Sequence, residues 1–159
     1  MSRHPLVLVF AALIVVVSPA PAAAQYIGAY AFTGVAGPHA PLWQGGGGIE
    51  RVFTNGVGVS AEGGVATNGD RYQKLTQLTV NGLYHYRMKD RHIDPFLLGG
   101  VGILADWDGG YGAFTIGGGV NYWTSLRIGV RLEVKDNISP TPSNGLFHMP
   151  GFQIGIVLR

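Results

Sequence analysis

The amino-acid sequence predicts an all-β fold, an eight-stranded antiparallel up-and-down transmembrane β-barrel. Three observations lead to this prediction. Apolar and polar residues alternate with a period of two in eight segments after residue 24, which is typical of strands with two different faces. These segments are as long as the roughly 9–11 residues that a membrane-spanning strand needs. The links between them are alternately short and long, as in membrane barrels.

An export signal precedes these segments. Arg3 and the amino terminus are positively charged, residues 6–17 form a short apolar run, and three alanines at 22–24 fit a cleavage site. We expect cleavage after Ala24, which leaves residues 1–24 as a signal peptide and 25–159 as one outer-membrane β-barrel domain. A retained anchor is less favoured, because crossing a membrane takes about 20 apolar residues.

The expected strands follow one another along the mature chain. They cover residues 26–35, 42–53, 56–66, 75–88, 94–105, 111–123, 125–135 and 147–158. Thr54-Asn55-Gly56 predicts a tight turn because Asn and Gly tolerate positive φ. The links near Thr124 and at 89–92 are also short. The longer links are 36–41, 67–74, 106–110 and 136–146. An even number of strands places both termini at the end with the short turns.

The composition supports a folded β protein. The chain has 26 glycines, and they lie within alternating apolar runs and not in a polar low-complexity tract. It has no cysteine, so the hydrogen-bond network has to provide stability without disulfides. The whole chain has 11 Lys and Arg against 9 Asp and Glu, and loss of Arg3 brings these numbers closer still. This near balance argues against a nucleic-acid partner.

The segment 125–135 shows most clearly how the two faces of a strand differ. Apolar and mostly charged positions alternate there: Leu126, Ile128, Val130, Leu132 and Val134 against Arg127, Gly129, Arg131, Glu133 and Lys135. In a membrane barrel the apolar face meets lipid, and the charges point inwards, where they have to pair. Glu62 and Arg131 are the expected pair, and strand tilt leaves Glu133 or Arg127 as alternatives. The expected interior polar network is Glu50, Glu62, His85, Arg87, Arg127, Arg131, Glu133 and Lys135.

Aromatic residues gather near the expected strand ends. They are Tyr26, Trp43, Phe53, Tyr86, Phe96, Tyr111, Tyr122, Trp123 and Phe147. Aromatic side chains at both ends of the spanning strands are typical of the girdles that membrane proteins place at the lipid–water interfaces. We therefore expect these residues to form two aromatic girdles on the outside of the barrel.

Two neighbouring segments carry a resemblance to a known family. DPFLLGGVGI (94–103) followed by FTIGGGVNYWTSLRIGVRLEVKD (114–136) resembles small outer-membrane β-barrel proteins of the OmpA/OmpX-like superfamily. In that family a strand with the pattern P-[FY]-x-x-G-G-x-G precedes G-G-G-x-x-Y and a strand with Arg-x-Glu. The resemblance covers essentially the whole mature chain. Such proteins often end in an aromatic residue that the assembly machinery reads, whereas this sequence ends in Leu158-Arg159.

The expected function is a structural or surface-interaction role in the outer membrane, with a closed polar interior. We expect no open pore, because eight strands leave little internal space. The expected partners are outer-membrane lipid and the outer-membrane assembly machinery, with no nucleic acid and no cofactor, and the protein is expected to be a monomer. One alternative is a soluble periplasmic ligand-binding β-barrel with its apolar faces turned inwards. A second is a lipid-modifying outer-membrane enzyme.

No residue pattern predicts a catalytic or metal site. The glycine runs 45–48 and 117–119 do not match a phosphate-binding loop. The segment 106–109 lacks the bidentate acid of a calcium loop, and the histidines are not at ligand spacing: His39, His85, His92 and His148. Ser60, Glu62 and His85 share the inward face of neighbouring strands. Such a set is catalytic only when hydrogen bonds link its members, and we expect a structural polar network instead.

Overall fold

Eight strands account for nearly all of the residues that the computed structural model describes, which are 24–37, 41–69, 74–86, 88, 92–106, 109–140 and 145–159. The strands are β1 (Ala24–Ala36), β2 (Leu42–Phe53), β3 (Val57–Thr67), β4 (Lys74–His85), β5 (Ile93–Ala105), β6 (Gly110–Trp123), β7 (Ile128–Pro140) and β8 (Leu146–Leu158). Each strand pairs antiparallel with the next, and β8 pairs with β1, so the sheet closes into a barrel. The predicted fold class is confirmed.

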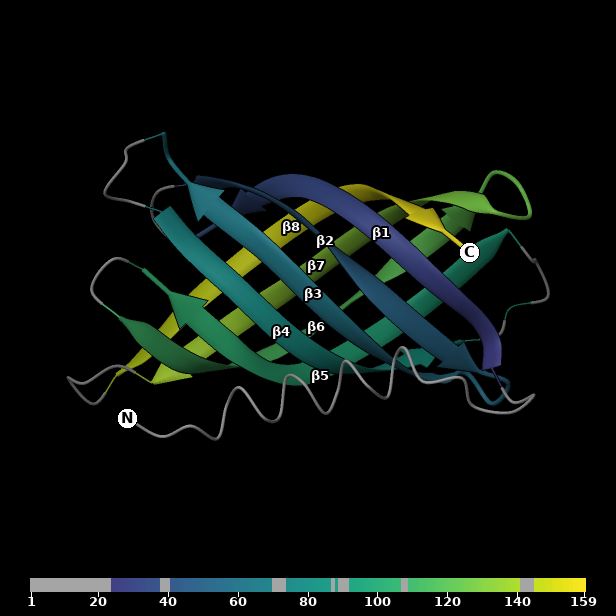
Figure 1. The fold of residues 1–159 in the computed structure, drawn as a ribbon, viewed down its shortest axis with the longest axis horizontal. Coiled ribbons are helices and arrows are strands. Elements are labelled where there is room, and N and C mark those ends of the chain that lie inside the picture. The colour runs from purple at the N-terminus through teal and green to yellow at the C-terminus, as the bar shows by residue number, and fades with distance from the viewer. Residues whose placement is uncertain are drawn as a thin grey trace.

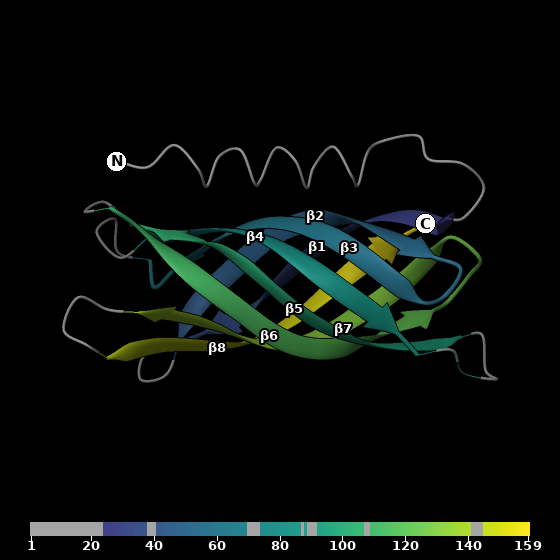
Figure 2. The same ribbon diagram turned by 90° about the horizontal axis from the view of Figure 1, so that it is seen from below.

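The strands run obliquely around the long axis of the barrel (Figure 1, Figure 2). The carboxyl terminus and the turn between β6 and β7 lie at the same end, on the right in Figure 1. The last residues of β1, β3, β5 and β7 and the first residues of β2, β4, β6 and β8 lie at the opposite end, which we call the loop end. The predicted separation of short turns from longer loops is wrong, because the β4–β5 link (86–92) is longer than the loop-end links β5–β6 (106–109) and β7–β8 (141–145). Within the described residues, no helix is long and apolar enough to cross a membrane. The predicted signal peptide lies outside the described residues, except for Ala24.

The predicted tight turn between β2 and β3 is present. Gly56 has a φ of +86°, which glycine adopts without steric cost. Its N–H donates to the Phe53 carbonyl oxygen at 2.9 Å, and the Val57 N–H donates to Asn55 Oδ1 at 3.1 Å. The turn therefore satisfies its own backbone groups and fixes the register of β2 against β3.

The strand β7 begins later than predicted, because the turn before it needs four residues, 124–127, and not one. The Ile128 carbonyl oxygen accepts hydrogen bonds from the Thr124 N–H and hydroxyl, both at 3.0 Å. The Ile128 N–H donates to Ser125 Oγ at 3.0 Å. These bonds close the turn and leave Arg127 outside the strand.

The same strand also continues further than predicted, to Pro140. The segment Asp136–Pro140, which its Asn, Ser and Pro residues mark as a loop in the sequence, pairs with Leu146–Pro150 of β8. The inward-facing side chains of this segment find partners inside the barrel: the Ser139 hydroxyl donates to the Gly112 carbonyl oxygen at 2.9 Å. Turn-forming residues therefore extend the strand here because their polar groups face a polar interior.

Glycines on the inner face make room for the aromatic rings of β1. A Cβ atom added to Gly48 would lie 2.5 Å from the Tyr30 hydroxyl and 2.7 Å from the Ala61 carbonyl oxygen. A Cβ atom added to Gly63, whose position faces outwards, would meet nothing closer than a Leu78 methyl group at 3.8 Å. The two positions therefore form a matched pair for testing how tightly the interior is packed.

We expect Gly48→Ala to lower the free energy of unfolding by about 1–3 kcal/mol, because the added methyl overpacks the interior and displaces the Tyr30 ring. Gly63→Ala should have a clearly smaller effect. Urea unfolding of the two variants in lipid vesicles measures both values. Equal losses of stability would show that the interior is looser than this packing requires.

Candidate functional site: the apolar belt and the polar interior

Large apolar side chains cover the outside of the barrel. Those that are exposed there include Ile27, Leu78, Leu97, Val101, Ile116, Val130, Leu132, Val134, Ile154 and Ile156. They alternate along each strand with buried residues that face inwards, many of them polar. A soluble barrel would show the opposite arrangement, with an apolar core and a polar outside. This outer surface, which we call the apolar belt, is suited to contact with lipid.

Arg131 lies at the centre of the interior. Its Nη1 is 2.8 Å from Glu50 Oε2 and its Nη2 is 2.9 Å from Glu133 Oε2. The guanidinium carbon is also 4.3 Å from the centre of the Tyr30 ring and 4.1 Å from that of Phe96. Arginine suits this position because its planar group binds carboxylates and packs against aromatic rings at the same time.

Lys135 forms a second charged centre nearer the loop end. It is ion-paired with Glu62, and its Nζ is 3.5 Å from Glu133 Oε1. Glu62 also accepts hydrogen bonds from the Tyr30 hydroxyl at 3.0 Å and from Gln77 Nε2 at 3.4 Å. The predicted pairing of Glu62 with Arg131 is therefore wrong, because the offset between tilted strands brings a residue further along β7 opposite Glu62.

Neutral polar side chains fill the interior between Lys135 and the loop end. Asn137 Nδ2 donates to Gln77 Oε1 at 3.3 Å, and the Thr115 hydroxyl donates to Asn137 Oδ1 at 2.8 Å. Gln153 Nε2 donates to Gln44 Oε1 at 3.3 Å. The predicted network contains only charged residues and a histidine, so it does not include these neutral side chains. Their inward positions in the two-residue alternation were the available signal.

Aromatic side chains fill the interior at the end with the short turns. His85 Nδ1 is 2.9 Å from Asp94 Oδ1, and the His85 ring stacks on Phe96 with the ring centres 5.4 Å apart. Tyr26 contacts Trp123 edge to face at 5.9 Å. The Arg159 guanidinium carbon lies 4.0 Å from the centre of a Trp123 ring. These groups narrow the interior between Arg131 and the end of the barrel with the short turns.

The structure places most of the predicted network residues inside the barrel. They are Glu50, Glu62, His85, Arg131, Glu133 and Lys135, each at most 4% exposed. The prediction for Arg127 is wrong, since this residue is exposed in the β6–β7 turn. Arg87 lies outside the described residues.

The predicted girdle residues separate into two groups. Trp43, Tyr86 and Tyr122 are 69%, 46% and 52% exposed and Phe53 is partly buried, and the girdle role of these four stays a prediction. The girdle prediction is wrong for the residues that turn inwards: Tyr26, Phe96, Tyr111, Trp123 and Phe147. In β5 both alternating sets of positions are apolar, so the sequence pattern does not show which set faces outwards.

The possible Ser/His/acid set is not assembled. Ser60 Oγ accepts a hydrogen bond from Asn81 Nδ2 at 3.4 Å, while His85 is bound to Asp94 and Glu62 to Lys135. Among the described residues no hydrogen bond links these three side chains. The same residues contain no group of three or more His, Cys, Asp or Glu that could hold a metal ion. His39 and the centre of the segment 106–109 lie outside the described residues.

Comparison with solved structures agrees with this geometry. Neisserial surface protein A superposes with a TM-score of 0.66 at 12% identity, covering 83% of this chain and 94% of that one. The N-terminal β-barrel domain of Pseudomonas aeruginosa OprF superposes with a TM-score of 0.64 at 14% identity, covering 83% and 95%. The chain has the fold of the small outer-membrane β-barrels. The expected likeness to the OmpA/OmpX-like superfamily is confirmed as a likeness of fold.

This outer-membrane barrel fold does not by itself specify an activity. A transmembrane β-barrel designed de novo superposes with a TM-score of 0.61 at 18% identity, covering 83% of this chain and 92% of that one. The sequence matches no family model and no curated relative. The function therefore has to be argued from the surfaces and the interior of this barrel.

Proposed function

We propose that the protein is an exported outer-membrane β-barrel with a structural or surface-interaction role, and that its interior is closed to solutes. The observation that carries the proposal is the polarity of the barrel, which has large apolar side chains outside and paired charges inside. Outer-membrane lipid is the partner of the apolar belt. The outer-membrane assembly machinery inserts the chain, and the inserted protein is a monomer whose loop end faces the external medium.

The packing of the interior supports its closure. Arg131, which contacts both the Tyr30 and Phe96 rings and binds Glu50 and Glu133, is 3% exposed. Eight strands leave an interior just wide enough for side chains to fill. An ion that crossed the barrel would have to break at least one of these buried ion pairs, which is costly in a low-dielectric interior.

Membrane insertion can be tested by expressing the full chain and separating the inner and outer membranes. We expect the protein in the outer-membrane fraction, and we expect its folded and boiled forms to migrate differently on a gel. Recovery in the soluble periplasmic fraction would contradict the proposal and favour the soluble binding barrel. Analysis of the lipids in the same fraction would detect products of a lipid-modifying enzyme.

Closure predicts that vesicles containing the folded protein retain a small entrapped solute such as glucose. The matched control is vesicles that received the same amount of protein after boiling. We expect the rates of glucose release from the two preparations to agree. Faster release from vesicles with the folded protein would show an open path through the barrel and would contradict the proposed closed interior.

A further inference from the structure

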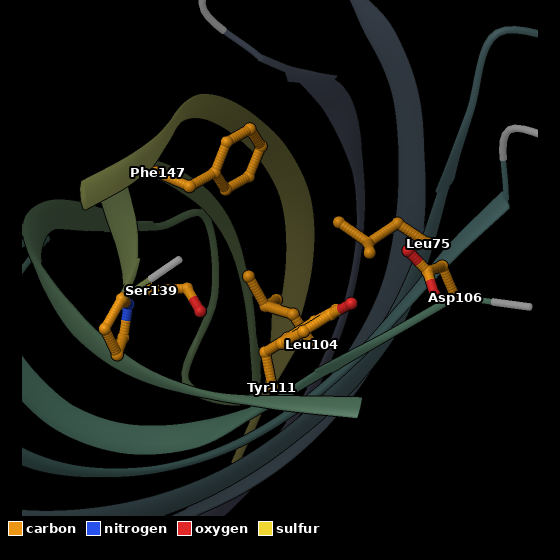
Figure 3. A pocket seen from close by; sticks show the side chains of 7 residues that line it. Leu75, Leu104, Asp106, Tyr111, Ser139 and Phe147 are labelled. Carbon is orange, nitrogen blue, oxygen red and sulfur yellow. The ribbon is translucent and has the colours of Figure 1, made fainter. Parts of the chain in front are cut away.

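An apolar cup opens inside the barrel at the loop end. Leu75, Leu104, Tyr111 and Phe147 point into one shared space from four different strands, with Asp106 and Ser139 also in its wall (Figure 3). The cup has a volume of about 290 Å³. Most of its lining side chains are apolar, whereas the interior between the cup and Lys135 is polar.

The cup is closed at its base. Leu104 belongs to a buried apolar cluster with Ala36, Ala113 and Met149, and Leu75 packs against this cluster. The next inward-facing residue along each of three lining strands belongs to the polar network: Gln77 after Leu75, Thr115 after Ala113, and Asn137 before Ser139. The cup is thus a blind recess and not the entrance of a channel.

The two aromatic side chains of the cup are exposed, whereas Leu104 is buried at its base. Tyr111 and Phe147 are 41% and 40% exposed although their positions face inwards. A concave apolar surface with a few fixed polar groups is the usual form of a small-molecule site. A cavity of about 150 Å³ lined by Leu, Ile and Phe binds benzene, so a cup about twice that size has room for two fused rings.

Two polar groups at the cup restrict the charge of a ligand. The Asp106 carboxylate accepts a hydrogen bond from the Gly109 N–H at 3.0 Å. The backbone N–H of Asp106 donates to the Gly109 carbonyl oxygen at 2.9 Å. These bonds hold a negative charge at the rim, which disfavours anions. The Ser139 hydroxyl donates to Gly112 and keeps a lone pair that can accept a hydrogen bond from a ligand.

We infer that this cup binds small aromatic molecules of about two rings that carry a hydroxyl donor and no negative charge. The inference rests on the proposed function, because the loop end has to face the external medium for such a molecule to reach the cup. The aromatic body lies against Leu104, Tyr111 and Phe147, and the hydroxyl donates to Ser139. The surface-interaction role then includes recognition of a small aromatic compound.

The test uses the full mature chain in lipid nanodiscs with labelled leucine methyl groups and 2-naphthol as the probe. We expect the methyl signals of Leu75 and Leu104 to shift and to saturate as 2-naphthol is added. Leu97 and Leu132, which face lipid, provide an internal control. Their signals should shift in proportion to the concentration of 2-naphthol dissolved in the bilayer, without saturating. A response at Leu75 and Leu104 that does not saturate would overturn the inference.

Variants and a charged probe test the geometry of the cup. Phe147→Ala should weaken binding by about tenfold, equivalent to about 1.4 kcal/mol. Leu146→Ala, at the exposed neighbouring residue that does not line the cup, should leave binding unchanged. The anion 2-naphthoate should bind less tightly than 2-naphthol, and Asp106→Asn should narrow this difference. Equal binding of the two probes to the unaltered protein would overturn the ligand class.

Two further outcomes separate this inference from the proposed function. Nuclear Overhauser contacts between the Leu104 methyls and another side chain of the protein filling the cup would overturn the inference alone. A chain that enters nanodiscs but does not bind 2-naphthol would do the same. A chain that does not enter bilayers would overturn the proposed function, and with it the inference that depends on the outward-facing loop end.

Discussion

Leu132→Arg should lower the free energy of unfolding in bilayers by about 2–4 kcal/mol, the cost of a basic side chain at the membrane midplane. The outward positions of β7 are apolar from Ile128 to Val134 and are followed by Asp136, so Val130 and Leu132 occupy the middle of the run. Leu132 is 38% exposed on the apolar belt and pairs with Val120 and Ile154. The measurement is urea unfolding of the refolded variant in lipid vesicles.

Ile128→Arg is the matched control, because it makes the same substitution on the same face at the end of the apolar run. Near the interface an arginine side chain reaches the headgroups, and the expected loss falls to about 0–1 kcal/mol. Equal losses at the two positions would show that depth in the bilayer does not determine the cost. The apolar belt would then not be a lipid-facing surface.

Lys135→Met should lower the free energy of unfolding by about 3–5 kcal/mol, the usual cost of removing one partner of a buried ion pair. The interior network has three carboxylates, Glu50, Glu62 and Glu133, against two cations, Arg131 and Lys135. Removing Lys135 leaves all three carboxylates with one cation. Glu62→Gln alone should cost less, because it leaves two carboxylates with two cations.

The double variant Glu62→Gln with Lys135→Met restores the excess of one carboxylate. We therefore expect it to be more stable than Lys135→Met alone, which gives a favourable coupling energy in a double-mutant cycle. The cycle is built from the free energies of unfolding of the unaltered protein, the two single variants and the double variant, all measured in the same vesicles. Strictly additive effects would show that Glu62 and Lys135 do not interact in the folded protein, and would contradict the network described above.

The two-residue alternation determined the strands, because each strand has to present different side chains to lipid and to the interior. The Thr54-Asn55-Gly56 turn was predictable for a local reason, since Gly56 adopts a φ of +86° within three residues of sequence. The ends of β7 were not predictable in this way. Its first turn depends on the Thr124 and Ser125 side chains. Its last residues depend on polar partners inside the barrel, on the neighbouring strand for Ser139 and across the interior for Asn137.

The alternation also identified most of the charges that face inwards, with Arg127 as an exception, but it did not show which of them meet. Glu62 pairs with Lys135 and not with Arg131, because the stagger of tilted strands sets the relative height of β3 and β7. The same limit applies to aromatic residues. Phe96 lies in a strand that is apolar at both alternating positions, so only closure of the barrel decides that its ring packs on Arg131 inside.

The sequence by itself therefore determined the number and order of the strands, the apolar belt and the inward face of β7. Tertiary structure alone decided the ion-pair partners, the inward-facing aromatics and the apolar cup between Leu75, Leu104, Tyr111 and Phe147. The physical reason is the range of the interactions. Alternation and turn chemistry act within one strand and its neighbour in sequence, whereas contacts across the interior depend on how far each strand is shifted when the sheet closes.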